Sequence, residues 1–447
     1  MRNIFTLIIG LVTICLSMVI DVPLVRAAGG MVWHKVQLTD GINNAYNPNI
    51  TTDGSRLYYV YTVDNGSGNL QLWTAVSDMG GDNFTATQRT TYTTPGVLSA
   101  SENIEVAGGK VIYSWIERKS PSVREVWTAS MDSDGNNWVA VQQTNDGNNI
   151  KVHTSMDIQS GKVFLAWHQT GLGNSIYTAI MNTDGSGFVR TKRTADFATN
   201  ENPQILATNA RVFVLWREWE NTYTYARLKF GYMNFDGTDF TIVDLTDFSA
   251  LRVVNDITTD GSYIYAVWYE GLNSHQRLMY SRINFDGTGF NEQLLHDKPY
   301  TPPLPADDYD FIPHIDYDTN QIYITWEEYY GSGWDIFTGV LDLDDGEFRP
   351  TQRLTDSTGL ARARFAINGD VIYYAYTDFS GVATIYLAIE NNIDTREDGA
   401  IVTATVPSSL EFTIDGITAG NACANSGGNA SVTTTATSIP FGTYAGA

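Results

Sequence analysis

A carboxylate or amide recurs along the 447-residue chain, always two residues after a recurring aromatic residue. The members of this set are Glu117, Gln169, Glu218, Glu270, Glu328 and Asp378. Two carboxylates about 5–10 Å apart can hydrolyse a glycosidic bond, so the set is a candidate for that chemistry. The alternative is that each residue ends a strand and accepts hydrogen bonds from loop amides. Equivalent positions in successive repeats favour this structural role, because catalysis needs residues that differ between repeats.

Aromatic residues gather in the loops near the fourth, fifth and sixth aromatic positions, whereas the matching loops of repeats one, three and seven are rich in Gly, Ser and Asn. These aromatic residues are Trp219, Tyr223, Tyr225, Tyr269, Tyr329, Tyr330 and Trp334. Beside Glu218, Glu270 and Glu328 they suit stacking on a sugar ring or anchoring of a protein partner. The alternative is that the rings pack on neighbouring loops. We take these aromatic and acidic residues as a candidate binding site, together with Arg362 and Arg364.

No set of residues with metal-ligand spacing is found. The six histidines show no His-x-x-x-His spacing, which excludes a common zinc pattern. The segment Asp342-Leu343-Asp344-Asp345 could bind calcium, but a hairpin turn explains it equally well, and calcium needs about six oxygen ligands. The sequence also lacks a Gly-x-Ser-x-Gly motif and a phosphate-binding loop. We therefore assign no catalytic residue, metal ligand or cofactor, and calcium is the remaining alternative.

The elements that must position these residues are repeats of about 50 residues, each marked by one aromatic residue at the end of a short apolar run. The markers are Tyr61, Trp115, Trp167, Trp216, Trp268, Trp326 and Tyr376. The runs are short, rich in β-branched and aromatic residues and bounded by Gly, Asn and Asp, as buried strands are.

A second strand and an Asp-Gly turn follow each run, as at Asp134-Gly135 and Asp236-Gly237. Asp-Gly between apolar strands indicates a hairpin. Another aromatic residue stands three positions after the glycine, and an outer strand follows it. Four strands in about 50 residues predict one blade of a β-propeller, since a β-sandwich would need about 100 residues.

The two ends of the repeat region predict how the propeller closes. The seventh repeat, 363–391, has only three strands, and the orphan segment 33–40 matches the outer strand 240–247 of the fourth repeat. We predict an all-β, seven-bladed propeller over residues 31–391, in which the N-terminal strand completes the last blade and leaves no open sheet edge.

The flanking regions predict an exported protein. Arg2, the apolar run 4–20 and the small residues near Ala28 indicate a signal peptide over 1–28, and an uncleaved membrane anchor is the alternative. We expect residues 392–399 to form a charged linker before a partial β-rich tail, 400–447, with truncation of the chain inside this tail as an alternative. The mature chain keeps only Cys423. The net charge of −23 argues against nucleic acid and against anionic membranes as partners.

The repeats resemble those of TolB-like propellers, in which the unit runs from a turn like 52–57 or 259–264 to a strand ending in Leu-Thr, as in 353–355. They are also similar to sialidase-type propellers, whose Asp-box is approached by 130–138. A sialidase would imply three arginines, a Tyr/Glu nucleophile pair and an acid. The innermost strands supply only Arg362 and Arg364, so we do not expect that chemistry. The tail resembles the start of an Ig-like stalk domain of bacterial surface proteins.

These observations predict a monomeric β-propeller that is secreted, extracellular or displayed at the cell surface, with the periplasm as an alternative address. We expect it to bind a glycan or an extracellular protein without catalysis and with no membrane contact beyond the export signal. One alternative is a sialidase-like glycoside hydrolase or a lyase that uses carboxylates on the same face. Another is a structural element of a larger surface protein.

Overall fold

The computed structural model describes most of the repeat region and only two short strands of the tail. The described residues are 25–26, 32–64, 66, 68–92, 102–120, 122–147, 150–171, 173–272, 275–299, 313–330, 333–354, 361–369, 371–379, 381–391, 403–405 and 438–440. The chain divides into two compact units, Met1–Glu390 and Asn391–Ala447. Apart from residues 25–26, the expected signal peptide lies outside the described residues, as does the expected linker 392–399.

Every regular element in the described part of the first unit is a β-strand, and pairing groups the strands into blades that we number along the chain. Blade 1 comprises β3 (Ala45–Thr52), β4 (Arg56–Asp64), β5 (Leu70–Asp78) and β6 (Thr85–Gln88). Blade 2 comprises β7 (Asn103–Ala107), β8 (Lys110–Ser120), β9 (Val123–Asp132) and β10 (Val139–Gln142). Blade 3 comprises β11 (Lys151–Gln159), β12 (Lys162–Gly171), β13 (Gly173–Asn182) and β14 (Val189–Lys192). Blade 4 comprises β15 (Thr199–Ala207), β16 (Arg211–Trp219), β17 (Ala226–Asn234) and β18 (Thr241–Asp244).

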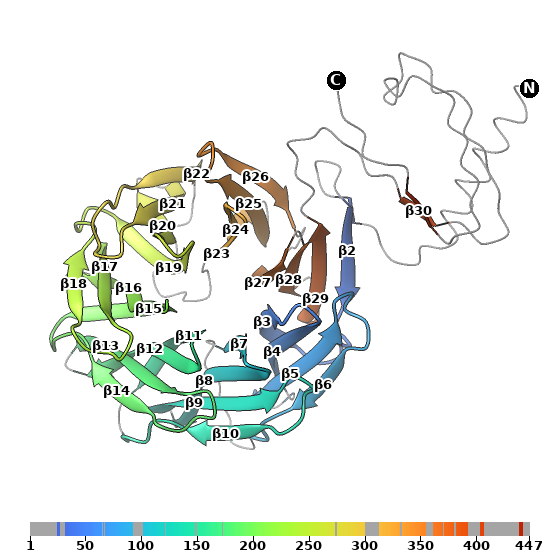
Figure 1. Cartoon of the computed structure of the whole chain (residues 1–447), viewed down its shortest axis with the longest axis horizontal. Coiled ribbons are helices and arrows are strands. Elements are labelled where there is room, and N and C mark those ends of the chain that lie inside the picture. The colour runs from blue at the N-terminus through green and yellow to red at the C-terminus, as the bar shows by residue number, and fades with distance from the viewer. Residues whose placement is uncertain are drawn as a thin grey trace, which may run out of the picture. The chain divides into compact units, whose positions relative to one another are not determined.

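One parallel pair, Asn174 of β13 with Thr199 of β15, joins blades 3 and 4 into a single sheet, and the later blades repeat the order of four antiparallel strands. Blade 5 comprises β19 (Leu251–Thr259), β20 (Ile264–Leu272), β21 (His275–Ile283) and β22 (Gln293–Pro299). Blade 6 comprises β23 (His314–Asp318), β24 (Gln321–Tyr330), β25 (Gly333–Asp342) and β26 (Phe348–Arg353). Blade 7 comprises β27 (Ala361–Asn368), β28 (Val371–Asp378), β29 (Thr384–Asn391) and the N-terminal β2 (Val32–Gln37). Figure 1 shows the sheets following one another around a ring, with the first strand of each blade innermost. The predicted all-β propeller fold is confirmed.

The N-terminal strand pairs where the sequence predicts. In β2, His34 lies opposite Ile389 and Gln37 lies opposite Tyr386 of β29, so that β2 is next to β29 in the sheet (Figure 1). The short β1 (Val25–Arg26) pairs with the other edge of β2. Residues more than 340 positions apart are thereby joined, as in the 2.9 Å hydrogen bond from Leu38 N to Ile385 O.

The core lies between neighbouring sheets and is built from stacked rings. The recurring aromatic residue stands between the two aromatic residues that follow it in the repeat, as when Trp115 stacks on Trp127 at 5.9 Å and on Trp138 at 6.3 Å between centroids. In blade 3, Trp167 stacks in the same way on Tyr177 and Phe188. Burial of each ring stabilises the fold by about 1.5–3 kcal/mol. These stacked aromatic residues therefore build the core between the sheets.

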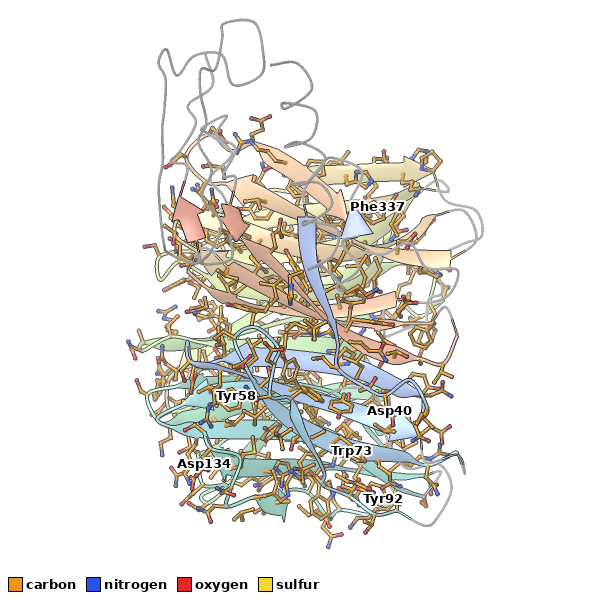
Figure 2. The ribbon with its side chains drawn as sticks, turned by 90° about the vertical axis from the view of Figure 1, so that its right-hand side faces the viewer. Asp40, Tyr58, Trp73, Tyr92, Asp134 and Phe337 are labelled. Carbon is orange, nitrogen blue, oxygen red and sulfur yellow. The ribbon has the colours of Figure 1, made fainter. Side chains whose placement is uncertain are left out.

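The Asp-Gly turns have the geometry that their sequence predicts. Gly135 has a φ of 87°, a left-handed conformation that a residue with a Cβ adopts only with strain, and Asp134 Oδ1 accepts a 2.9 Å hydrogen bond from Asn136 N. The turn also ties two blades together, because Tyr58 of blade 1 donates a hydrogen bond to Ser133 O at 3.0 Å. Tyr58 and Asp134, the residue after Ser133, are labelled in Figure 2.

The second unit is described only at β30 (Thr403–Thr405) and β31 (Ser438–Pro440), which pair antiparallel. These two strands fall within the expected β-rich tail, 400–447, and the rest of that tail lies outside the described residues. In the described part of the chain, the structure has no helix long and apolar enough to cross a membrane.

Candidate functional site

The rim glutamates, Glu218, Glu270 and Glu328, stand near the ends of β16, β20 and β24, as the repeat predicts. Glu218 contacts Lys229 at 2.6 Å and Arg227 at 3.2 Å, both from β17. Asp244 of β18 contacts the same two cations. The Glu218 carboxylate is thus one member of a network of ion pairs.

The other two rim glutamates are also ion-paired, Glu270 within blade 5 and Glu328 of blade 6 with two residues of β22 in blade 5. Glu270 lies 3.3 Å from Arg252 and 3.6 Å from Arg277, and burial raises its pKa although these cations oppose the shift. Glu328 lies 2.6 Å from Lys298 and 3.4 Å from His296. Burial alone would raise the pKa of Glu328, but the hydrogen bonds from these two residues hold it below its usual value. The geometry therefore agrees with the structural role that equivalence across repeats favours.

Three of the candidate aromatic residues are buried. The Trp219 indole donates a 2.7 Å hydrogen bond from Nε1 to Glu201 Oε2, and the Tyr269 hydroxyl donates to Glu327 O at 2.7 Å. Trp334 packs in the hydrophobic cluster between blades 5 and 6. Their faces are covered by protein, so the expectation that Trp219, Tyr269 and Trp334 stack on a ligand is corrected.

Two candidate aromatic residues remain exposed on the rim loop, residues 220–225, which joins β16 to β17. Tyr223 is 59% exposed and Tyr225 is 39% exposed, and the Tyr223 ring lies on Trp219 with 5.9 Å between centroids. Glu220 holds the loop closed, because its Oε1 accepts hydrogen bonds from Thr222 Oγ1 at 2.6 Å and from Tyr225 N at 3.1 Å. Tyr223 has a φ of 55°, a strained value for an aromatic residue.

A third exposed ring next to the rim loop was not identified from the sequence. Phe197 is 79% exposed, and two residues later Thr199 Oγ1 lies 3.0 Å from the Tyr223 hydroxyl. The matching phenylalanine of the next repeat, Phe248, is covered by the Arg227 guanidinium at 4.7 Å from the ring centroid. A comparison of these two repeats in the sequence could have identified Phe197 as a further candidate. The side chains of Tyr329, Tyr330 and Arg362 lie outside the described residues.

The centre of the ring holds a cavity of about 380 Å³, lined by the innermost strands of all seven blades. One level of the cavity carries Gln204, Asp256, His314 and Arg364. Each of these residues stands on the first strand of its blade and pairs, on the second strand, with the residue that precedes the recurring aromatic. His314 Nδ1 lies 3.1 Å from Asp256 Oδ2, and Gln204 Nε2 lies 3.1 Å from His153 Nε2. Arg364 is the candidate residue that the structure brings into this cavity.

A second level of the cavity carries the cavity carboxylates, Glu105, Asp157 and Asp316. Each of these acids pairs, on the second strand of its blade, with the residue three positions before the recurring aromatic. It therefore stands two residues further along the first strand than the residue of the first level. Burial raises the pKa of Asp157 and of Asp316 to about 6, and their hydrogen bonds oppose the shift. These acids occur in only three blades, so they break the symmetry that the rim glutamates follow.

Within the described residues, histidine, cysteine and acidic side chains nowhere gather three at a time in a way that could hold a metal ion. In the segment considered for calcium, Asp342 Oδ1 accepts a 2.9 Å hydrogen bond from Asp344 N, and Asp342 Oδ2 lies 3.6 Å from Arg349. The segment Asp342–Asp345 thus belongs to a hairpin turn whose own groups contact the Asp342 carboxylate.

No family model matches the chain, and no curated protein matches its sequence. Solved structures do share its fold. An oligogalacturonate lyase in complex with manganese has 12% identity and a TM-score of 0.53, covering 82% of this chain and 95% of its own. An oligogalacturonate lyase from Vibrio parahaemolyticus has 13% identity and a TM-score of 0.52, covering 81% and 95%. A polysaccharide lyase has 8% identity and a TM-score of 0.51, covering 77% and 90%. At these identities the likeness shows the fold alone, and the chain is a β-propeller protein.

Proposed function

We propose that the chain is a secreted or cell-surface β-propeller that binds a glycan at the rim loop of blade 4 without cleaving it. The observation that carries this proposal is the pair of exposed rings, Tyr223 and Tyr225, on a loop already closed by Glu220. A preorganised aromatic surface loses little conformational entropy when a sugar ring stacks on it.

The polar groups around the rings support a sugar rather than an apolar partner. Glu220 and Thr222 lie on the same loop, and Thr199 Oγ1 lies 3.0 Å from the Tyr223 hydroxyl. The turn motifs are consistent with a place among TolB-like or sialidase-type propellers. The pairing of every rim glutamate with cations supports binding without hydrolysis, because no rim carboxylate among the three is left to act as acid or base.

A glycan array tests this proposal directly. We expect the mature chain to bind at least one glycan, and a Tyr223→Ala/Tyr225→Ala double variant to lose at least about 2 kcal/mol of binding free energy. Ile242→Ala, at an exposed apolar residue on β18, is the matched control and should bind normally. Absence of any glycan ligand, or equal binding by the double variant, would reject the proposal.

A lyase or glycoside hydrolase acting in the central cavity is the second candidate, and His314 is the observation that favours it. Burial, and then the charge of Arg364, lower the pKa of His314 to about 4, which leaves a neutral imidazole beside Asp256. A neutral imidazole oriented by a carboxylate can accept a proton. Release of unsaturated or reducing sugars that stops in a His314→Gln variant would establish this activity in place of simple binding.

A further inference from the structure

The rim loop holds a carboxylate in a fixed position next to its two exposed rings. Glu220 begins the loop and is bonded to both tyrosines through the backbone: Tyr223 N donates to Glu220 O at 3.1 Å, and Glu220 N donates to Tyr225 O at 3.1 Å. The side chain is fixed as well, because Oε1 accepts hydrogen bonds from Thr222 Oγ1 and from Tyr225 N. Any ligand that stacks on these rings therefore meets the Glu220 carboxylate.

One oxygen of this carboxylate is available to a ligand. Both hydrogen bonds within the loop end on Oε1, so Oε2 accepts none from the described residues. The Glu220 side chain is only partly buried, which leaves it within reach of a bound molecule. An ionised carboxylate accepts hydrogen bonds and donates none, so Oε2 requires a donor group on the ligand.

The negative charge of Glu220 is not neutralised within the fold. Among the described residues, no basic side chain forms an ion pair with Glu220 or lies over the ring of Tyr223 or Tyr225. The nearest basic residue in sequence, Arg217, is buried under the Trp219 ring and pairs with Glu201 at 2.9 Å. Glu220 thus differs from the rim glutamates, each of which has basic partners.

The other polar groups of the rim loop carry no charge. Asn221, Thr222 and Thr224 are all exposed, and each has a short side chain with hydrogen-bonding capacity. The Tyr223 hydroxyl lies 3.0 Å from Thr199 Oγ1, which is also uncharged. Glu220 is therefore the one charged residue in the segment 220–225.

This single charge discriminates between classes of sugar. A hydroxyl or an ammonium group can donate to Oε2, whereas a uronate or a sialate brings a second negative charge close to the first. Two like charges about 5 Å apart at a protein surface repel strongly enough to change an affinity by about fivefold or more. The net charge of −23 acts in the same direction on any acidic ligand.

We propose that Glu220 makes the rim loop selective for glycans without acidic groups, with a sugar hydroxyl donating to Glu220 Oε2 while the ring stacks on Tyr223 or Tyr225. This inference rests on glycan binding at the rim loop and adds the class of glycan to it. Glu220 is the residue that determines the specificity, and the two tyrosines provide the contact area.

Tetrasaccharides that share a backbone and differ in charge test the proposal on the mature chain. One series is cellotetraose, the β-1,4-linked glucuronate tetramer and the β-1,4-linked glucosamine tetramer. The second is the α-1,4-linked galactose tetramer and the matching galacturonate tetramer. Affinities are measured at about pH 6, where carboxylates are ionised and amines are protonated.

In each series that binds, we expect the neutral tetramer to bind at least about fivefold more tightly than the acidic one. The amino tetramer should bind at least as tightly as the neutral one. Equal or tighter binding of the acidic tetramer would overturn the selectivity and leave glycan binding itself in place. If neither these series nor the glycan array yields a ligand, both proposals fail.

A charge-removing variant assigns the selectivity to one residue. Glu220→Gln keeps the Oε1 acceptor of the loop and removes the charge, so the preference for the neutral tetramer should fall below about twofold. Glu347→Gln removes the same charge from an exposed hairpin turn and should keep the parent's preference. An unchanged preference in folded Glu220→Gln, or the same fall in Glu347→Gln, would show that Glu220 is not the determinant.

A second variant decides if Glu220→Gln does not melt cooperatively. Asn221→Lys adds a cation to the exposed part of the loop and leaves Glu220 in place. It should raise the affinity for the acidic tetramer at least about fivefold and change that for the neutral one little. An unchanged affinity for the acidic tetramer in this variant would contradict selection by charge at the rim loop.

Discussion

The rim glutamates and the cavity carboxylates are both sets of acids on the blades, but they differ in their partners. Glu218, Glu270 and Glu328 each contact two basic side chains. Among the described residues, Glu105, Asp157 and Asp316 form no ion pair, and burial raises the pKa of each of them. The acid at the equivalent rim position has two basic partners in each of blades 4, 5 and 6, whereas the three cavity carboxylates have none among the described residues.

This comparison changes where function is sought on the ring. A carboxylate whose charge is neutralised by cations of its own or the neighbouring sheet contributes to the fold and is a poor acid, base or ligand. Negative charge that lines a cavity without a cation is the stronger indication of a bound molecule. The exposed rings of the rim loop are a separate feature, because they would contribute apolar contact area, and not charge, to the binding of a ligand.

The largest effect on the free energy of unfolding is expected when a buried cation that pairs with a rim glutamate is removed. The Arg252 side chain is 3% exposed and contacts Glu270 and Glu292, and its Nη1 also donates to Asp247 O. Arg252→Met should cost about 3–5 kcal/mol of unfolding free energy, because Glu270 is left buried beside fewer charges. Urea denaturation measures this loss.

The control for this variant is Lys192→Met, because Lys192 and its partner Asp196 are both far more exposed than Arg252. It should change the stability little. Similar small losses in both variants would show that the rim ion pairs are not needed to neutralise the glutamates, and the comparison would fail.

A smaller effect on the free energy of unfolding, of opposite sign, is expected when the cavity acid Asp157 is replaced. The folded pKa of Asp157 is about 6, above the ordinary value, so its ionisation opposes folding. The contribution of this group to stability is fully present below about pH 4 and is lost as the pH rises through 6. Asp157→Asn should therefore stabilise the protein by up to about 3 kcal/mol at pH 7–8 and have little effect near pH 4.

Thermal or urea unfolding across that pH range measures the difference between Asp157→Asn and the parent. Asp236→Asn is the matched control, because hydrogen bonds from Thr238 lower the pKa of this turn aspartate. It should lose stability at neutral pH. Destabilisation at pH 7 by Asp157→Asn, growing with pH, would contradict the account of the cavity.

The smallest effect is expected for Glu218→Gln. Asp244 still contacts both Arg227 and Lys229 when the Glu218 charge is removed, so the cations keep a partner. The loss should be about 1 kcal/mol or less, as for other partly exposed ion pairs. Glycan binding should persist, and a loss of binding equal to that of Tyr223→Ala would show that Glu218 belongs to the site.

The fold was accessible from the sequence because its determinants recur. Trp115, Trp167 and Trp216 mark equivalent strands, and the Asp-Gly turns mark the hairpins between them, so each repeat confirms the interpretation of the others. The partner of β2 could be inferred in the same way, from the strand missing at the end of the last repeat.

The candidate site was only partly accessible, because exposure is decided by packing between loops. Trp219 and Tyr223 are four residues apart in one loop region, yet the first is buried under the second. Their residue types do not predict which of the two is buried and which is exposed. The cavity acids stand on strands that the sequence does identify, but their lack of cations depends on which blades face each other across the axis. Phe197 could have been noticed by comparison with Phe248.

The central claim is that the partly buried cavity acids form no ion pair among the described residues while the rim glutamates are ion-paired, and carboxyl ¹³C NMR titration tests it most directly. With labelled aspartate, two resonances should titrate near pH 6 and should disappear one at a time in Asp157→Asn and Asp316→Asn. With labelled glutamate, Glu328, assigned by Glu328→Gln, should titrate below its ordinary range. If instead every aspartate titrates in its ordinary range, the cavity level carries no unpaired buried charge, and the account is contradicted.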